Sequence, residues 1–190
     1  MLNKDQIRYK YIKIRKKKYY EVTKKYFNPL KLYLNKKFKQ KKIYLSFYYP
    51  SNCEVNILIF FAINNFKKNI VSLLPSISGK HNMKFYKWNF LEPLKVNKYG
   101  LLEPNSKKNS NIPNVILVPL LAFDDRNYRL GYGKGYYDRY LNKYLNTNKH
   151  ILTIGVAFSF QKYNKLPINN HDVKLDYILT EKGMKKAWIF

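Results

Sequence analysis

A buried apolar run that leads through several glycines into a helical pattern constrains the fold most. Residues 115–118 form a continuous apolar segment of the kind found in strands covered on both faces. Gly131, Gly133 and Gly135 follow, and residues 136–145 carry apolar side chains at helical spacing. A buried strand that connects through glycines to a helix predicts an α/β domain.

Further apolar patterns predict helices and strands along the rest of the chain. Helical spacing recurs in residues 4–26 and in residues 55–66, where Ser51 or Asn52 is the expected cap. Prolines, a glycine and a polar Ser/Lys/Asn stretch in residues 92–113 indicate a long loop. The remaining strands are expected at residues 44–48, 69–74, 83–88, 151–158 and 175–179.

This alternation of strands and helices predicts one domain over residues 1–190. We expect a three-layer α/β/α open sheet that is mostly parallel, with helices on both faces. Ligands of such sheets bind outside the carboxyl ends of the strands.

The chain is strongly basic, with 37 lysine and arginine residues against 11 acidic ones and a formal net charge of +26. Most of the basic residues are lysines, and they accompany many Asn, Tyr, Phe and Ile residues, all with AT-rich codons. Drift in genome base composition explains such a set, although the surface would attract polyanions in a salt-dependent way. A basic RNA- or DNA-binding protein is an alternative, but the chain lacks an RRM aromatic motif, a zinc module and an Arg-rich arm.

Composition excludes several other classes. With 46% hydrophobic residues, the chain is too apolar to be disordered. Cys53 is the only cysteine, which excludes an intramolecular disulfide and a multi-cysteine metal cluster and fits a reducing compartment such as the cytoplasm. The longest apolar runs are about nine residues, whereas a membrane span needs roughly 20, so no membrane segment is expected.

Residues 124–139 bring glycines, cations and a helix start together. Glycines allow the backbone to approach a ligand closely, and the unpaired N–H groups of a helix start favour an anion. Lys134, Arg129 and Arg139 add positive charge, and Asp138 is a candidate magnesium ligand. The spacing fits neither a Walker A loop nor the dinucleotide fingerprint. A plain strand-to-helix turn is the simpler alternative, but the combination favours a phosphate-binding loop.

The phrase VPLLAFDDRNYRLGYGKGYYDRYL, residues 118–141, resembles the signature of the 5-formyltetrahydrofolate cyclo-ligase family, also called methenyltetrahydrofolate synthetases. Shorter elements in the same order are also similar to that family: KDQIR at 4–8, CEV at 53–55, LLP at 73–75, MKF at 83–85, EP at 103–104 and the stretch 154–181. The resemblance therefore spans almost the whole chain.

The resemblance implies an enzyme that uses ATP and magnesium to convert 5-formyltetrahydrofolate into 5,10-methenyltetrahydrofolate. The γ-phosphoryl group passes to the formyl oxygen, the second folate nitrogen attacks the activated carbon, and ADP and phosphate are released. Because phosphorylation turns a poor leaving group into a good one, the protein mainly positions its substrates and neutralises charge. We expect a cytoplasmic monomer with no membrane or specific nucleic-acid partner.

The resemblance also implies residue roles. Lys134 and Arg129 are the expected catalytic residues, and Asp138 and Asp172 the expected magnesium ligands. The expected folate contacts are Tyr49, Glu54, Met83, Tyr132 and Tyr136. The expected ATP contacts are Lys4, Arg8, Arg129, Leu130, Gly131, Tyr132, Gly133, Lys134, Gly135, Tyr136 and Tyr137.

Simpler alternatives exist for some of these roles. Lys4 and Arg8, which share a helical face, could be two of many surface charges. Asp172 could only form a turn, and Glu54 could only favour a helix start.

The chain also departs from the family pattern at a few positions. Asn127 stands where the family usually has glycine, and Asn tolerates the left-handed conformation. Asn56 and Ile57 replace a common acidic residue and threonine, and Leu101 or Leu102 stands where some members carry an aromatic side chain. Because the composition has drifted, a degraded family member that binds nucleotide without turnover is a third hypothesis.

Overall fold

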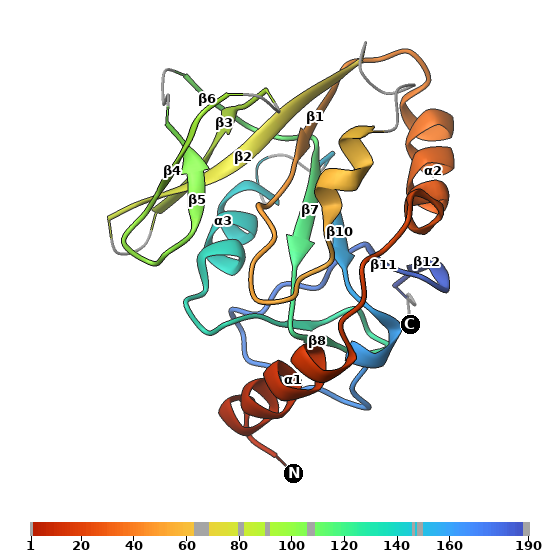
Figure 1. Cartoon of the computed structure of the whole chain (residues 1–190), viewed down its shortest axis with the longest axis vertical. Helices are drawn as coiled ribbons and strands as arrows, with labels where there is room; N and C mark the ends of the chain where they lie inside the picture. Colours follow the sequence, from red (N-terminus) through yellow and green to blue (C-terminus); the bar gives the residue numbers. More distant parts are fainter. Residues whose placement is uncertain are drawn as a thin grey trace.

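The computed structural model describes residues 2–62, 69–79, 82–89, 92–105, 109–145, 147 and 150–187. Its centre is an eight-stranded sheet in the order β12-β11-β10-β7-β1-β2-β3-β6 (Figure 1). Strands β11, β10, β7, β1 and β2 run parallel, whereas β12, β3 and β6 run antiparallel to their neighbours. The predicted mostly parallel sheet is thus confirmed. Its strands are β1 Ile43–Ser46, β2 Ile70–Ser78, β3 Asn82–Lys87, β6 Ser110–Asn111, β7 Val115–Pro119, β10 Leu152–Val156, β11 Tyr177–Thr180 and β12 Gly183–Lys186.

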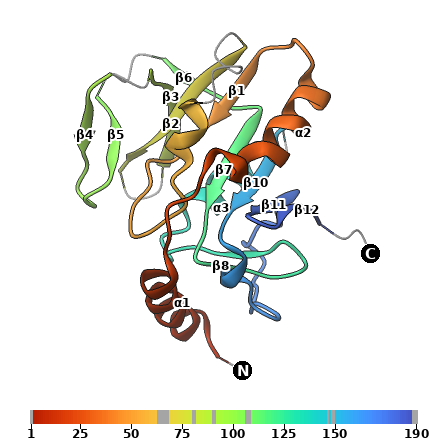
Figure 2. The same ribbon diagram turned by 45° about the vertical axis from the view of Figure 1, so that its right-hand side comes forward.

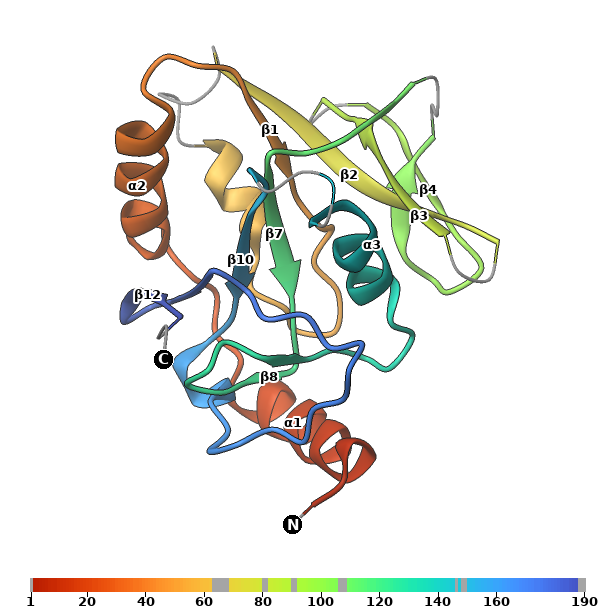
Figure 3. The same cartoon turned by 180° about the vertical axis from the view of Figure 1, so that it is seen from behind.

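Helical elements cover both faces of this sheet, as the three-layer prediction requires. α2 (Asn28–Phe38) lies on one face with the 3₁₀ turns η1 (Lys24–Phe27) and η2 (Ile57–Ala62), and α3 (Tyr136–Leu145) lies on the other (Figures 1 and 3). Alternate residues of β7 pack into opposite layers, because successive strand side chains point to opposite faces. The continuous apolar run in β7 follows from this double burial.

The helix α1 (Lys4–Lys18) lies beyond the carboxyl ends of the parallel strands, where the arrowhead of β7 points in Figure 1. Its buried Ile7 and Tyr11 pack against Ala122 and Leu130. These two residues belong to the short hairpin of β8 (Ala122–Phe123) and β9 (Arg129–Leu130), which was not predicted and separates β7 from the glycines. The basic face of α1 therefore lies at the edge of the sheet where a ligand is expected.

The predicted helix over residues 4–26 is wrong beyond Lys18. α1 ends at Lys18, and Tyr19 and Tyr20 leave it so that their rings pack on Phe158. The chain becomes helical again in η1 and then in α2, which was not predicted although Pro29 near its start is a helix-start signal.

The predicted long loop over residues 92–113 is also wrong. It contains β6 and the hairpin of β4 (Leu94–Val96) and β5 (Leu102–Pro104), which Figure 2 shows standing beside the sheet. The Asn97 side chain organises the turn by accepting hydrogen bonds from the backbone N–H groups of Tyr99 and Leu101. Buried Glu103 ties the hairpin to β2 by accepting a 2.8 Å hydrogen bond from the Ser76 hydroxyl.

Smaller differences concern residues 55–74. The helix predicted over residues 55–66 is wrong in its described part, residues 55–62, where the 3₁₀ turn η2 begins only at Ile57. Ile63 and Phe66 lie outside the described residues. The strand predicted for residues 69–74 continues through Pro75 to Ser78. Pro75 lies beyond the last pairing of β2 with β1, so its missing N–H removes no hydrogen bond to that strand. None of the described helices combines the length and apolarity needed to cross a membrane.

Candidate active site

A cleft of about 930 Å³ opens at the carboxyl ends of the parallel strands. The first turns of α1, the hairpin β4–β5, the glycine loop and the start of α3 all contribute to its wall. Every residue selected from the sequence lines it: Lys4, Arg8, Tyr49, Glu54, Met83, Arg129, Leu130, Gly131, Tyr132, Gly133, Lys134, Gly135, Tyr136, Tyr137, Asp138 and Asp172. The structure thus brings these residues together, whereas their individual roles stay predictions.

The glycine loop runs from β9 into α3 and approaches two arginines closely. Gly133 and Gly135 have φ angles of +95° and +65°, which side chains other than glycine rarely adopt. A Cβ atom on Gly133 would lie 3.2 Å from the guanidinium carbon of Arg8, and one on Gly135 would lie 2.9 Å from Nη1 of Arg139. The loop needs glycine at both positions, and it delivers the positive end of α3 to the cleft.

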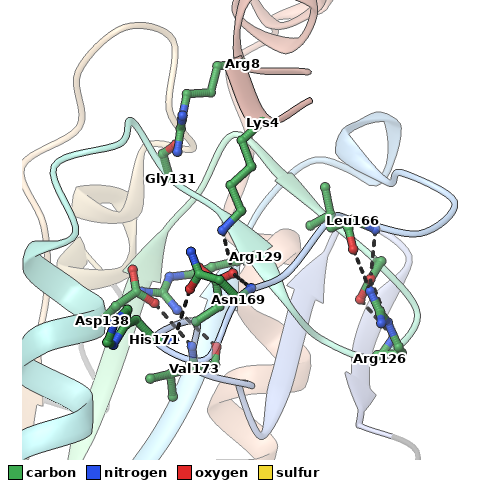
Figure 4. A network of polar contacts seen from close by, with 12 residues as sticks. Lys4, Arg8, Arg126, Arg129, Gly131, Asp138, Leu166, Asn169, His171 and Val173 are labelled. Atoms are coloured by element: carbon green, nitrogen blue, oxygen red, sulfur yellow. Dashed lines mark hydrogen bonds and ion pairs between the residues drawn. The ribbon is translucent and has the colours of Figure 1, made fainter. Parts of the chain in front are cut away.

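Cations from two distant segments meet at this loop. Arg8 Nε donates a 3.0 Å hydrogen bond to the carbonyl of Gly131, as Figure 4 shows. Lys4 Nζ lies 2.5 Å from Oδ2 of Asp172, so α1 is connected both to the glycine loop and to the loop that carries Asp172. Lys134 is exposed in the cleft and has no ion-pair partner among the described residues. Its ammonium group is therefore available to an anionic ligand.

Arg129 is held firmly in the wall of the cleft. Its Nη2 atom lies 2.9 Å from Oδ1 of Asp138, and Nη1 donates a 3.2 Å hydrogen bond to the carbonyl of Val173 (Figure 4). The Arg129 side chain is only 3% exposed, so this ion pair is shielded from solvent on one side. The backbone N–H of Val173 also donates to Oδ1 of Asp138, which closes a small polar ring.

Asp138 and Asp172 are compatible with magnesium but do not form a complete site. The ion pairs with Arg129 and Lys4 engage one oxygen of each carboxylate and leave a second oxygen outside these contacts. The described residues contain no group of three or more His, Cys, Asp or Glu that could hold a metal. Magnesium often binds through one or two carboxylates together with substrate phosphates, and this donor set fits that arrangement.

Glu54 is a buried carboxyl group in the same cleft. Its Oε2 atom accepts a 3.0 Å hydrogen bond from the backbone N–H of Ser51. Burial raises the pKa of Glu54, and the positive charge of Arg15 opposes that shift. Burial also raises the pKa of neighbouring Tyr132 to about 12, with a further contribution from the negative charge of Glu54.

Two polar residues in or behind the cleft wall, Tyr99 and Arg15, were not predicted. The hydroxyl groups of Tyr99 and Tyr136 lie 2.9 Å apart and connect the hairpin β4–β5 to the glycine loop. Arg15 is 1% exposed and donates a hydrogen bond to the hydroxyl of Tyr132 from behind the cleft wall. A signal for Arg15 was present, because it follows Tyr11 by four residues on the buried face of α1.

The structure shows where the residues that depart from the family pattern lie. Asn127 has a φ angle of +62°, which confirms that it adopts the left-handed conformation. The Asn56 side chain donates a 2.6 Å hydrogen bond to Glu21, and Ile57 is buried in the core, so neither belongs to the cleft lining. Leu101 and Leu102 both line the cleft.

Comparisons with known proteins give a consistent result. The model of the 5-formyltetrahydrofolate cyclo-ligase family matches residues 4–181. A 5-formyltetrahydrofolate cyclo-ligase of Mycoplasma genitalium is 35% identical over 139 residues, which cover 71% of this chain and 70% of that relative. The solved structure of a 5,10-methenyltetrahydrofolate synthetase of Aquifex aeolicus has a TM-score of 0.73 at 29% identity, with 98% of this chain and 94% of that one covered. The solved synthetase of Mycoplasma pneumoniae has a TM-score of 0.69 at 27% identity, with 94% and 98% covered.

Proposed function

This chain belongs to the 5-formyltetrahydrofolate cyclo-ligase family, and we propose that it uses ATP and magnesium to convert 5-formyltetrahydrofolate into 5,10-methenyltetrahydrofolate. ADP and phosphate are the other products. One observation carries the proposal: a single cleft is lined both by the glycine loop with its cations and by the buried carboxyl group of Glu54. Such a cleft offers room and opposite electrostatic character for a phosphate donor and a folate in mutual contact.

The phosphate tail of ATP would lie against the glycine loop. Arg8 reaches this loop from α1, and Lys4 of the same helix lines the same cleft. The α3 N-terminus adds the partial positive charge of its helix dipole. Lys134 would contact the γ-phosphoryl group, because its ammonium has no ion-pair partner within the described part of the chain. Magnesium, held by Asp138 and Asp172, would neutralise phosphate charge.

The reaction proceeds in two balanced steps. The formyl oxygen attacks the γ-phosphorus, the bond to the β-phosphate oxygen breaks, and ADP leaves. The second folate nitrogen then attacks the activated carbon and loses its proton, and the C–O bond breaks to release phosphate. Arg129, fixed by Asp138 and Val173, opposes the charge that develops on the transferred group in both steps.

The test is a spectrophotometric assay of the purified protein with ATP, magnesium and 5-formyltetrahydrofolate. The expected result is the near-ultraviolet absorbance of the methenyl product, with one ADP formed per product molecule and no product when ATP is omitted. ATP binding without product would refute the proposal in favour of a nucleotide-binding member without turnover. Tight RNA or DNA binding that survives moderate salt, in a protein without turnover, would favour the nucleic-acid alternative.

A further inference from the structure

Arg15 is a buried charge that the proposed reaction does not use. It lies in the last turn of α1 and is only 1% exposed, and it is not part of the cleft lining. Nη1 donates a 3.2 Å hydrogen bond to the carbonyl of Leu120, and Nη2 donates to the Tyr132 hydroxyl. Burying a guanidinium group is costly unless its charge is compensated, so its partners should explain its presence.

Glu54 is a buried acid close enough for the Arg15 charge to lower its pKa against the effect of burial. The titratable groups that face Glu54 come from three places: Arg15 from α1, Tyr132 and Tyr137 from the glycine loop and the start of α3, and Tyr48 from the segment after β1. Arg15 carries the positive charge in this group. Tyr132 lies between the two, because it accepts from Arg15 and contacts Glu54.

A second observation indicates that this cluster awaits a ligand. The hydroxyl group of Tyr137 is buried and lacks a hydrogen-bond partner among the described residues, although Tyr137 lines the cleft. The Nε atom of Arg15 is also buried without such a partner. Buried polar atoms are normally paired, so an unpaired hydroxyl in a cleft wall points to a group supplied by the substrate or by ordered water.

We propose that Arg15 is a positioning residue of the folate site: it holds the Tyr132 phenol and compensates the buried charge of Glu54, so that Glu54 accepts N–H hydrogen bonds from the substrate. The inference rests on the proposed function. The pterin ring of 5-formyltetrahydrofolate presents an amino group beside a ring N–H, and an ionised carboxylate can accept from both. A protonated carboxyl group would instead turn its own O–H donor toward the N–H donors of the pterin, so it would bind the pterin less well.

The test is calorimetric binding of 5-formyltetrahydrofolate in the absence of ATP over a range of pH, because loss of the Arg15 charge should raise the pKa of Glu54 further. Arg15→Met keeps most of the side-chain volume and removes the charge, and Arg15→Lys keeps the charge but loses the forked donors. Both are combined with Glu54→Gln in double-mutant cycles. ATP binding is measured alongside as the control for a general loss of structure.

We expect Arg15→Met to weaken folate binding by about tenfold or more at the acidic end of this range and less at the alkaline end, since alkali restores the carboxylate. Arg15→Lys should recover part of the loss, and ATP affinity should change by less than about twofold. In the Glu54→Gln background, loss of Arg15 should cost little more, because the group through which it acts is gone.

Losses that add in the double variant, that do not depend on pH, or that affect ATP equally would mark Arg15 as an anchor of α1 and overturn the inference. If Arg15→Met does not fold, the cycle with Arg15→Lys decides between the same two outcomes. A wild-type protein that does not bind 5-formyltetrahydrofolate overturns the proposed function together with the inference. Wild-type binding with additive losses overturns the inference alone.

Discussion

Lys134→Ala should separate catalysis from stability more clearly than other changes in the cleft. The Lys134 side chain is exposed and has no ion-pair partner among the described residues, so its removal should change the free energy of unfolding by less than about 0.5 kcal/mol. In the proposed reaction, however, its charge opposes the charge that develops on the transferred phosphoryl group. Loss of one such donor in other enzymes costs about 2.7–4 kcal/mol in the transition state, a factor of about 10²–10³ in kcat.

The assay is initial-rate formation of the methenyl product at saturating ATP and 5-formyltetrahydrofolate, with thermal unfolding measured on the same preparations. Lys143→Ala is the matched control. Lys143 is also an exposed lysine, but it lies in the last turn of α3 and does not line the cleft. The control should keep its rate and its melting temperature. A Lys134→Ala enzyme within about threefold of the wild-type kcat would refute the assignment of the glycine loop to the γ-phosphoryl group.

Three further predictions concern other parts of the structure. Gly133→Ala should raise the KM for ATP about tenfold, because a φ of +95° costs an L-residue about 1–2 kcal/mol and the new Cβ would press on Arg8. Gly131→Ala is the control and should have a smaller effect, since no atom lies within 4 Å of its added Cβ. Asp172→Asn keeps the turn-forming side chain but loses its charge. The magnesium concentration for half-maximal rate should therefore rise by about tenfold or more, corresponding to about 1.5–3 kcal/mol. An unchanged magnesium concentration for half-maximal rate would show that Asp172 only forms the turn. Burial raises the pKa of Tyr26 well above its usual value of 10, so the unfolded chain loses the Tyr26 proton at a lower pH than the folded protein does. The contribution of Tyr26 to the free energy of unfolding is therefore complete below pH 10 and declines as pH rises above it. Tyr26→Phe should therefore flatten the fall in melting temperature above pH 10, and an equal slope in both proteins would contradict this reasoning.

The central elements could be predicted because their signals are local. The apolar run of β7 and the helical spacing of α3 each lie within about ten residues, and the structure places both within one residue of the predicted limits. The end of α1 could not be predicted in this way. The helix ends where the rings of Tyr19 and Tyr20 pack on Phe158. Phe158 lies far along the chain, and local helix propensity carries no information about such a contact.

The same contrast explains the missed hairpin β4–β5. Its strands are only three residues long, and Pro93, Gly100 and Pro104, which are typical of loops, lie beside or within them. What orders them is the buried Glu103, which accepts hydrogen bonds from the Ser76 hydroxyl and the Ile77 N–H on β2. A glutamate next to a proline carries no sequence signal for such a distant partner, so the wall of the cleft that Leu102 contributes could not be derived before the fold was known.

The candidate site shows how apolar packing determines the position of charges. From the sequence, Lys4 and Arg8 only share a helical face, and their link to the glycine loop came from the family resemblance. In the structure, the buried face of α1 packs on the hairpin β8–β9, and this contact carries Arg8 to the carbonyl of Gly131. The same contact places Arg15 behind Tyr132. The helix α1 thus supplies positive charge both to the glycine loop and to Glu54. This double role explains why α1 is needed at the edge of the sheet, although most of its surface is exposed.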